Sequence, residues 1–154
     1  SGADKLEVCR QRGAAECIDY DREDLKARLK EITGEAGAQV VLDPVGGRYA
    51  EPALRGLGRG GRFVTLGYAS GEIPKIPLNL VMLKGITLVG MEIRTFATDY
   101  PDAIGRDDAE LRQLFAEGKL RPYIGARFPL EQAPAALRYV ADRKAVGKVV
   151  IDVA

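Results

Sequence analysis

The stretch Val40-Val41-Leu42-Asp43-Pro44-Val45-Gly46-Gly47 decides the fold. Its opening apolar run is rich in β-branched residues, which predicts a strand buried on both faces of a parallel sheet. The acid, the proline and the two glycines end that strand abruptly, and helix-forming sequence follows. Ligands of open parallel α/β sheets bind at the edge where such strands end. We therefore expect a ligand-binding loop directly after this strand.

Outward from this stretch, helix and strand patterns alternate along the chain. Glycines at 58–61 predict a turn, and Asp21 is the expected cap of the second helix. The alternation implies a parallel, doubly wound sheet with right-handed crossovers. We expect helices at 1–11, 22–33, 49–57, 78–83, 107–117 and 130–143, and strands at 14–20, 40–42, 62–67, 86–91, 122–128 and 148–153.

Composition and charge exclude several classes of partner. The chain has 46% apolar and 29% charged residues, an ordinary globular balance, and a net charge of +1 gives no reason to expect nucleic acid. The strongest apolar run, 86–91, is too short to cross a membrane. Residues 1–20 are charged throughout and do not read as a secretory signal, so we expect a cytoplasmic protein.

The chain has two cysteines, Cys9 and Cys17, and no histidine. Their spacing is not a zinc signature, so we expect no metal site in this chain and two buried free thiols, as suits a reducing compartment. Without a histidine, triads and acid–base chemistry that depend on one are excluded within this chain. We predict no catalytic residue.

Four blocks of sequence, in this order and at this spacing, resemble the C-terminal half of a medium-chain dehydrogenase/reductase. The resemblance is greatest to the NADPH:quinone oxidoreductase branch and covers almost the whole chain. The blocks are Lys5–Cys9 with Gly13-Ala14 and Ile18–Tyr20, then Val41–Gly47, then Gly60–Gly71, and last Gly118–Pro122 with Arg143–Val150.

The resemblance implies an α/β fold with an incomplete Rossmann-type, doubly wound parallel sheet. Strands 1 and 2 of the usual six, the glycine-rich pyrophosphate turn and the catalytic domain would all precede Ser1. We therefore expect a fragment of a longer protein. Residues 1–121 would be a partial dinucleotide-binding domain, and residues 122–154 a C-terminal αβ extension that joins the catalytic domain in intact relatives.

The function implied is that of an NADPH-dependent oxidoreductase fragment. The parent would transfer a hydride to a quinone or an α,β-unsaturated carbonyl without zinc, and this chain alone would be inactive. One alternative is a non-catalytic module that dimerises. Another is a fragment of a zinc-dependent alcohol dehydrogenase, for which the deciding residues would lie before Ser1.

The same resemblance implies roles for single residues. Lys5 and Tyr20 match positions that hold the adenosine 2′-phosphate, although Lys5 could equally be a solvated helix lysine. Asp43, Val45 and Gly46 match the loop under the nicotinamide ribose, where small residues allow close approach of backbone. An alternative for Asp43 is that it caps the following helix.

A second loop and one strand complete the implied site and interface. Gly67, Tyr68, Ala69 and Ser70 match the loop beside the nicotinamide ring, with a partly exposed core aromatic as the alternative for Tyr68. The strand Ile86–Met91 resembles the edge through which the family forms homodimers. The alternative is that a loop or the helix at 107–117 covers this edge.

Overall fold

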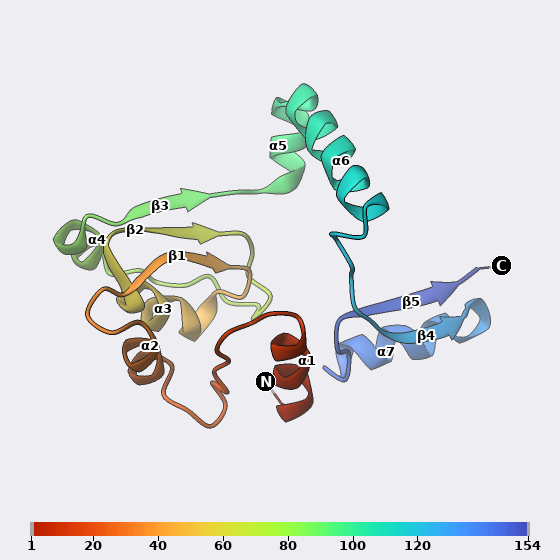
Figure 1. The fold of residues 1–154 in the computed structure, drawn as a ribbon, viewed down its shortest axis with the longest axis horizontal. Coiled ribbons are helices and arrows are strands. Elements are labelled where there is room, and N and C mark those ends of the chain that lie inside the picture. The colour runs from red at the N-terminus through yellow and green to blue at the C-terminus, as the bar shows by residue number, and fades with distance from the viewer. Residues whose placement is uncertain (1, 154) are drawn as a thin grey trace. The chain divides into compact units, whose positions relative to one another are not determined.

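The computed structural model describes residues 2–153, which form two compact units (Figure 1). The first unit is Ala15–Pro101. The second unit combines Gly2–Ala14 with the chain from Asp102 onward. Residue 1, the expected start of the first helix, lies outside the described residues. The expected domain boundary after residue 121 depends on how residues 122–154 pack in longer relatives, and it stays a prediction.

The first unit is built on a parallel three-stranded sheet in the order β1-β2-β3, as the alternation of helices and strands predicted. Val41 of β1 lies beside Phe63 of β2, which lies beside Leu88 of β3. Its elements are α2 (Leu25–Thr33), β1 (Ala38–Asp43), a 3-10 turn η1 (Gly47–Tyr49), α3 (Ala50–Gly56), β2 (Leu57–Thr65), α4 (Leu78–Lys84), β3 (Thr87–Gly90) and α5 (Ile93–Asp99).

The core of this unit lies between the sheet and α3. Leu54 and Leu57 are 0% and 1% exposed, so both side chains point into this core. Phe63 and Ile86 complete the buried cluster, and apolar residues of α4 pack against it. Burying a leucine side chain stabilises the fold by roughly 1.5–3 kcal/mol, so these side chains hold the strands and helices together.

The expectation that the β1 strand is buried on both faces is wrong. Val40 is 41% exposed and Leu42 is 65% exposed. The two parallel crossovers, β1 to β2 and β2 to β3, run in the same direction. Right-handed crossovers of this kind place both helices on one side of the sheet, and α3 and α4 indeed pack on one core. The face that carries Val40 and Leu42 is therefore left open.

The strand expected at 14–20 does not form. Instead the chain turns after Asp19, whose carbonyl accepts from the N–H groups of Arg22 and Glu23. A strand needs a neighbour to pair with, and the sheet ends at β1 on one side and β3 on the other. The helix that follows is capped by Asp24, which accepts from the N–H of Ala27 at 2.7 Å, rather than by Asp21.

The turn expected at 58–61 is also wrong, because β2 already begins at Leu57. Ala38 pairs with Leu57, whereas Val40 pairs with Arg62, so the extra residues of β2 form a bulge. Gly60 adopts a φ of +72° within it. The glycines thus interrupt the ladder without ending the strand.

The second unit contains a parallel pair of strands, β4 (Ile124–Pro129) and β5 (Lys148–Asp152). A 3-10 turn η2 (Leu130–Gln132) and the helix α7 (Ala133–Ala141) connect them, and Ala136 of α7 is buried. The helices α1 (Ala3–Gln11) and α6 (Pro101–Ala116) bury no side chain. Cys9 of α1 is consequently exposed and Cys17 only half-buried, against the expectation of two buried thiols.

Candidate functional site

The loops that follow β1 and β2 are hydrogen-bonded to one another at the carboxyl edge of the sheet. The N–H of Ala69 donates to the carbonyl of Pro44 at 3.0 Å, and the N–H of Ser70 donates to the carbonyl of Val45 at 2.9 Å. The structure therefore brings together seven of the nine expected cofactor-binding residues. They are Asp43, Val45, Gly46, Gly67, Tyr68, Ala69 and Ser70.

Asp43 organises the first of these loops. Its carboxylate Oδ1 accepts from the N–H groups of Val45 and Gly46, both at 2.9 Å, and the residue is only 7% exposed. The other oxygen, Oδ2, is buried without a hydrogen-bond partner in residues 2–153. The capping role considered for Asp43 is thus present in the structure, and a bond to a ribose stays a prediction.

The glycines after Asp43 allow the two loops to approach each other closely. A Cβ on Gly46 would lie 2.8 Å from Cδ1 of Tyr68, and a Cβ on Gly47 would lie 2.7 Å from Oγ of Ser70. Their φ angles of +67° and +57° also favour glycine. Gly67 differs, since a Cβ there would meet only the Pro44 carbonyl oxygen, at an ordinary 3.5 Å. Of these three glycines, Gly67 has room for added atoms.

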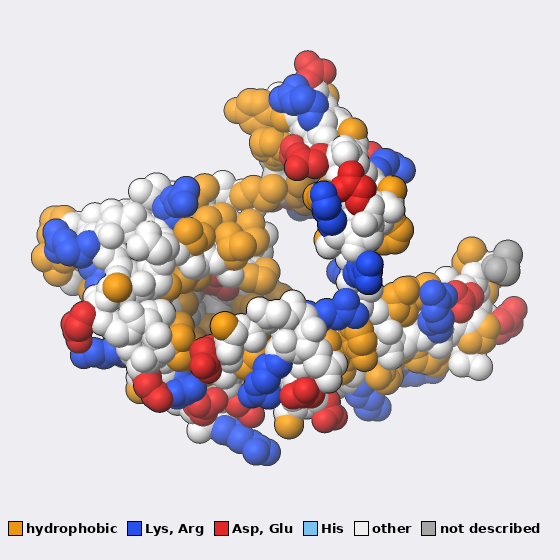
Figure 2. Space-filling model, viewed as in Figure 1, with side chains coloured by type: hydrophobic (Ala, Val, Ile, Leu, Met, Phe, Trp, Pro, Cys, Tyr) orange, Lys and Arg blue, Asp and Glu red, His pale blue; other side chains and the backbone are white. Residues whose placement is uncertain are grey.

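A hollow of about 670 Å³ opens where β2 and β3 end. Gly67 and Tyr68 line it on the β2 side, and Met91 lines it on the β3 side. Figure 2 shows hydrophobic side chains gathered where the strands of this sheet end. A concave, largely apolar site of this size can take a drug-sized ligand.

The helix α5, which the sequence analysis did not predict, also lines this hollow. Glu92 caps it: its carboxylate accepts from the hydroxyl of Thr95 at 2.7 Å, the N–H of Thr95 at 2.8 Å and Nε of Arg94 at 3.0 Å. The Thr95 hydroxyl and N–H, followed by the Arg94 donors, lower the pKa of Glu92 to about 2. The detectable signal was the aromatic pair at helical spacing, Phe96 and Tyr100.

The other two expected residues, Lys5 and Tyr20, lie in different units. Nζ of Lys5 donates to the carbonyl of Arg143 at 2.7 Å within the second unit. The ring of Tyr20 packs on Tyr49 in the first unit, with ring centroids 4.6 Å apart. Each therefore has a protein contact, and their role toward a 2′-phosphate stays a prediction.

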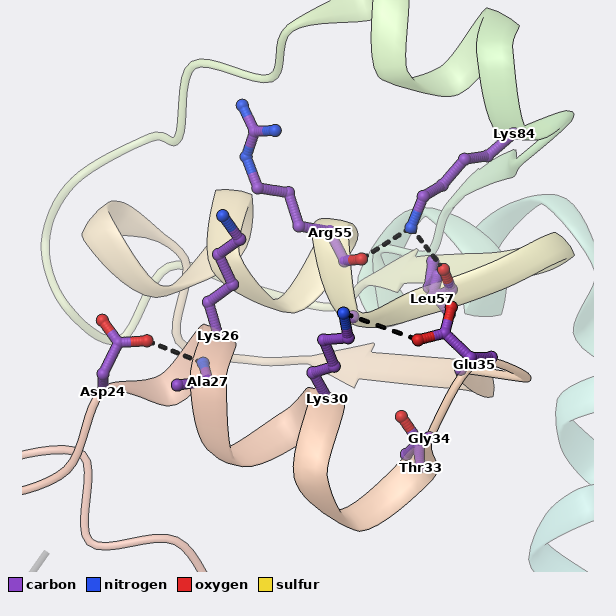
Figure 3. Close-up of a pocket in the computed structure, with 12 residues that line it drawn as sticks. Asp24, Lys26, Ala27, Lys30, Thr33, Gly34, Glu35, Arg55, Leu57 and Lys84 are labelled. Carbon is purple, nitrogen blue, oxygen red and sulfur yellow. Dashed lines mark hydrogen bonds and ion pairs between the residues drawn. The ribbon is translucent and has the colours of Figure 1, made fainter.

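A second hollow, of about 420 Å³, lies at the amino edge of the sheet and contains none of the expected site residues (Figure 3). Nζ of Lys84 donates to the carbonyls of Arg55 and Leu57, both at 2.6 Å. Arg55 lies in the last turn of α3 and Leu57 directly follows the helix, so a positive charge beside these carbonyls is favourable. The Lys84 ammonium therefore stabilises the fold at the amino edge of the sheet.

The described residues, 2–153, contain no cluster of three His, Cys, Asp or Glu side chains placed to hold a metal ion. None of their helices is both long and apolar enough to span a membrane.

The comparisons with known proteins all point to the same family. A family model described as zinc-binding dehydrogenase matches residues 12–151. The quinone oxidoreductase-like protein 2 homolog of Nematostella vectensis is 35% identical over 99% of this chain, which covers 42% of that relative. This chain therefore spans less than half the length of the relative that it matches.

Solved structures agree with this result. The Escherichia coli quinone oxidoreductase complexed with NADPH matches with a TM-score of 0.83 and 29% identity, over 98% of this chain and 47% of that chain. An NAD-dependent alcohol dehydrogenase matches with a TM-score of 0.81 and 28% identity, over 100% of this chain and 42% of that one.

Proposed function

The chain belongs to the zinc-binding dehydrogenase family, and on that premise we propose that it is the cofactor-binding part of an NADPH-dependent oxidoreductase. The observation that carries the proposal is the meeting of two strand-end loops beside a hollow at the carboxyl edge of a parallel sheet. The similarity to a quinone oxidoreductase complexed with NADPH supports the choice of cofactor.

The residues of the two loops fit the nicotinamide end of such a cofactor. When bound, the cofactor supplies the hydride that reduces a quinone or an α,β-unsaturated carbonyl. Gly67, Tyr68, Ala69 and Ser70 would line the ring, and Val45 and Gly46 the ribose. Asp43 holds the first loop in place and offers Oδ2 as a free acceptor. The apolar wall of the hollow would keep water from the ring.

Lys5, in the second unit, would donate to the 2′-phosphate. The Lys5 ammonium has three donors, of which the structure shows one bonded to Arg143, so two remain for a phosphate. The phenol hydroxyl of Tyr20, in the first unit, is a donor of the kind that a phosphate accepts from. We expect Lys5→Glu to weaken binding of NADPH about tenfold or more and that of NADH much less, with Lys26→Glu as a control outside the site.

Titration of the chain with NADPH, followed by nicotinamide fluorescence, tests the proposal. We expect saturable binding, and we expect Gly67→Val to abolish it because Gly67 lines the hollow and a valine there would take up room that the ring needs. Gly105→Val is the control, since a Cβ there meets nothing within 4 Å. Absence of binding by the folded chain at millimolar NADPH would refute the cofactor assignment for this chain.

A non-catalytic dimerising module is the second candidate, because β3 is an exposed edge strand. All four of its residues are exposed, and it pairs with β2 on one side only. We propose that the edge Ile86–Met91 joins two copies of the chain, whether or not the cofactor binds.

We also propose a cytoplasmic location. Cys9 and Cys17 are both free thiols, and an exposed thiol such as Cys9 persists in a reducing compartment. Mass measurement of the purified protein under non-reducing conditions after cytoplasmic expression would find both thiols unmodified.

A further inference from the structure

The second hollow, at the amino edge of the sheet, gathers basic side chains from three helices (Figure 3). Within residues 2–153 it is lined by four basic side chains, which are those of Lys26 and Lys30 on α2, Arg55 on α3 and Lys84 on α4. Asp24 and Glu35 are its acidic lining residues. The hollow therefore has an excess of two positive charges, although the whole chain carries a net charge of only +1.

Some of these charges are already compensated. The Asp24 carboxylate accepts from the N–H of Ala27 at 2.7 Å, at the positive N-terminal end of α2. Lys30 lies in the last turn of α2, and its Nζ is 3.5 Å from the Glu35 carboxylate. The Lys84 ammonium donates two of its three protons to carbonyls beside the end of α3. The excess positive charge therefore lies mainly on the remaining two basic side chains.

Lys26 and Arg55 are these side chains, and both have donors to spare. The Lys26 ammonium makes no ion pair or hydrogen bond with the described residues, and Figure 3 shows it extending from α2 toward α3. Arg55 bonds to Glu51 through Nε and Nη2, which leaves Nη1 without a partner in residues 2–153. Lys26 also lies one turn before Lys30, and like charges at this spacing destabilise a helix. A bound anion would relieve that repulsion.

We propose that this hollow binds the phosphate group of a small organic phosphate monoester. Such a group carries nearly two negative charges at neutral pH, which matches the excess on the lining. Lys26, Nη1 of Arg55 and the third proton of the Lys84 ammonium are the donors for its three oxygens. A volume of about 420 Å³ is within the range of small-molecule sites and leaves room for an organic group beside the phosphate.

The phosphate hollow is distinct from the proposed cofactor site. It lies where the strands begin, beside Gly37 and Leu57, whereas the cofactor loops follow the ends of β1 and β2. It is also too small to enclose a dinucleotide. The inference therefore goes beyond the proposed function and does not depend on it.

Titration of the whole chain with glycerol 3-phosphate, followed by backbone amide shifts in NMR, tests the inference. We expect saturable shifts at Ala27, Gly34 and Gly56, which line the hollow. Glycerol, which has no charge, should shift none of them. Inorganic phosphate should bind several-fold more weakly than the ester, because it leaves the rest of the hollow unfilled.

Three variants locate the phosphate. Lys26→Glu replaces an unpaired cation by an anion and should weaken binding of glycerol 3-phosphate at least tenfold. Arg55→Gln removes the guanidinium and should weaken binding several-fold. Lys148→Glu makes the same charge reversal at an exposed lysine of β5 and should bind the ester like the original chain. Circular dichroism checks that each variant is folded.

Unchanged binding by the folded Lys26→Glu variant, or no saturable shifts around the hollow, would overturn the inference. Equal losses in Lys26→Glu and Lys148→Glu would mean unspecific attraction and would also overturn it. Inorganic phosphate that binds as tightly as the ester would overturn the choice of an organic ligand. NADPH should bind to Lys26→Glu as it does to the original chain, so failure of this inference and failure of the cofactor proposal give different results.

Discussion

At the scale of a single residue, Asp43 shows how one buried carboxylate fixes a loop. Its Oδ1 satisfies two backbone N–H groups that Asp43→Ala would leave unpaired. Leaving buried donors unsatisfied costs about 1–3 kcal/mol, so we expect a loss of stability of that size in urea unfolding. Asp43→Asn keeps an accepting oxygen and should cost less. An Asn variant as unstable as the Ala variant would show that the negative charge, rather than the accepted bonds, matters.

Glu92 has a carboxyl pKa far below the ordinary value of a glutamate. Its pKa is lowered to about 2, first by the Thr95 side chain and then by the Thr95 and Arg94 donors. A carboxyl with a lowered pKa stabilises the fold above its unfolded pKa. Here that contribution to α5 is lost as the pH falls from about 4.5 toward 2.

NMR of the Glu92 carboxyl carbon during an acid titration measures this directly. We expect a midpoint near 2, and a higher midpoint in Thr95→Val because that change removes the hydroxyl donor. A midpoint at the ordinary glutamate value in the unchanged chain would contradict the capping geometry at the start of α5.

At the scale of elements, Lys84 ties α4 to the end of α3 and the start of β2. Its ammonium donates to two carbonyls at 2.6 Å (Figure 3). We expect Lys84→Met to lower the free energy of unfolding by about 1–2 kcal/mol, since both carbonyls lose their donor. Lys26→Met is the matched control, because Figure 3 shows no interaction for that lysine. Equal unfolding midpoints for the two variants would refute the role of Lys84.

The order of elements, and the meeting of the loops after β1 and β2, could be predicted from the sequence because they depend on local patterns. The β-branched run at 40–42 indicated a strand even though Val40 and Leu42 are exposed, and the acid, proline and glycines after it indicated the loop. The strand expected at 14–20 could not be judged in this way, since pairing depends on a distant neighbour.

The helix α5 was missed for a different reason. Its cap is Glu92, and glutamate is not among the residues that usually begin a helix. Half of the hollow's lining residues belong to α5 and its two caps, so the sequence patterns predicted the side formed by Gly67 and Tyr68 but not the side formed by Phe96 and Tyr100. The glycines of the sequence therefore predicted the two loops of the site. The helix on the other side of the hollow could not be predicted, because its capping residue is unusual.

At the scale of the whole molecule, the exposed edge of β3 makes association of two copies testable. The strand has the sequence Thr-Leu-Val-Gly without a charge, and one row of its backbone groups has no strand partner in residues 2–153. Such an edge pairs readily with another copy unless a charge opposes it. Val89→Lys would bring two like charges together across a two-fold axis, where they repel.

We therefore expect light scattering to give twice the 16.7 kDa chain mass for the original chain and a single chain mass for Val89→Lys. Val89 is already exposed, so the change should leave the fold intact, and circular dichroism checks this. Leu137→Lys adds the same charge at an exposed leucine of α7 and should remain dimeric. A monomeric original chain at high concentration, or a dimeric Val89→Lys variant, would refute pairing through β3. Pairing through this edge uses the side of β3 away from β2, so NADPH titration of Val89→Lys should match that of the original chain.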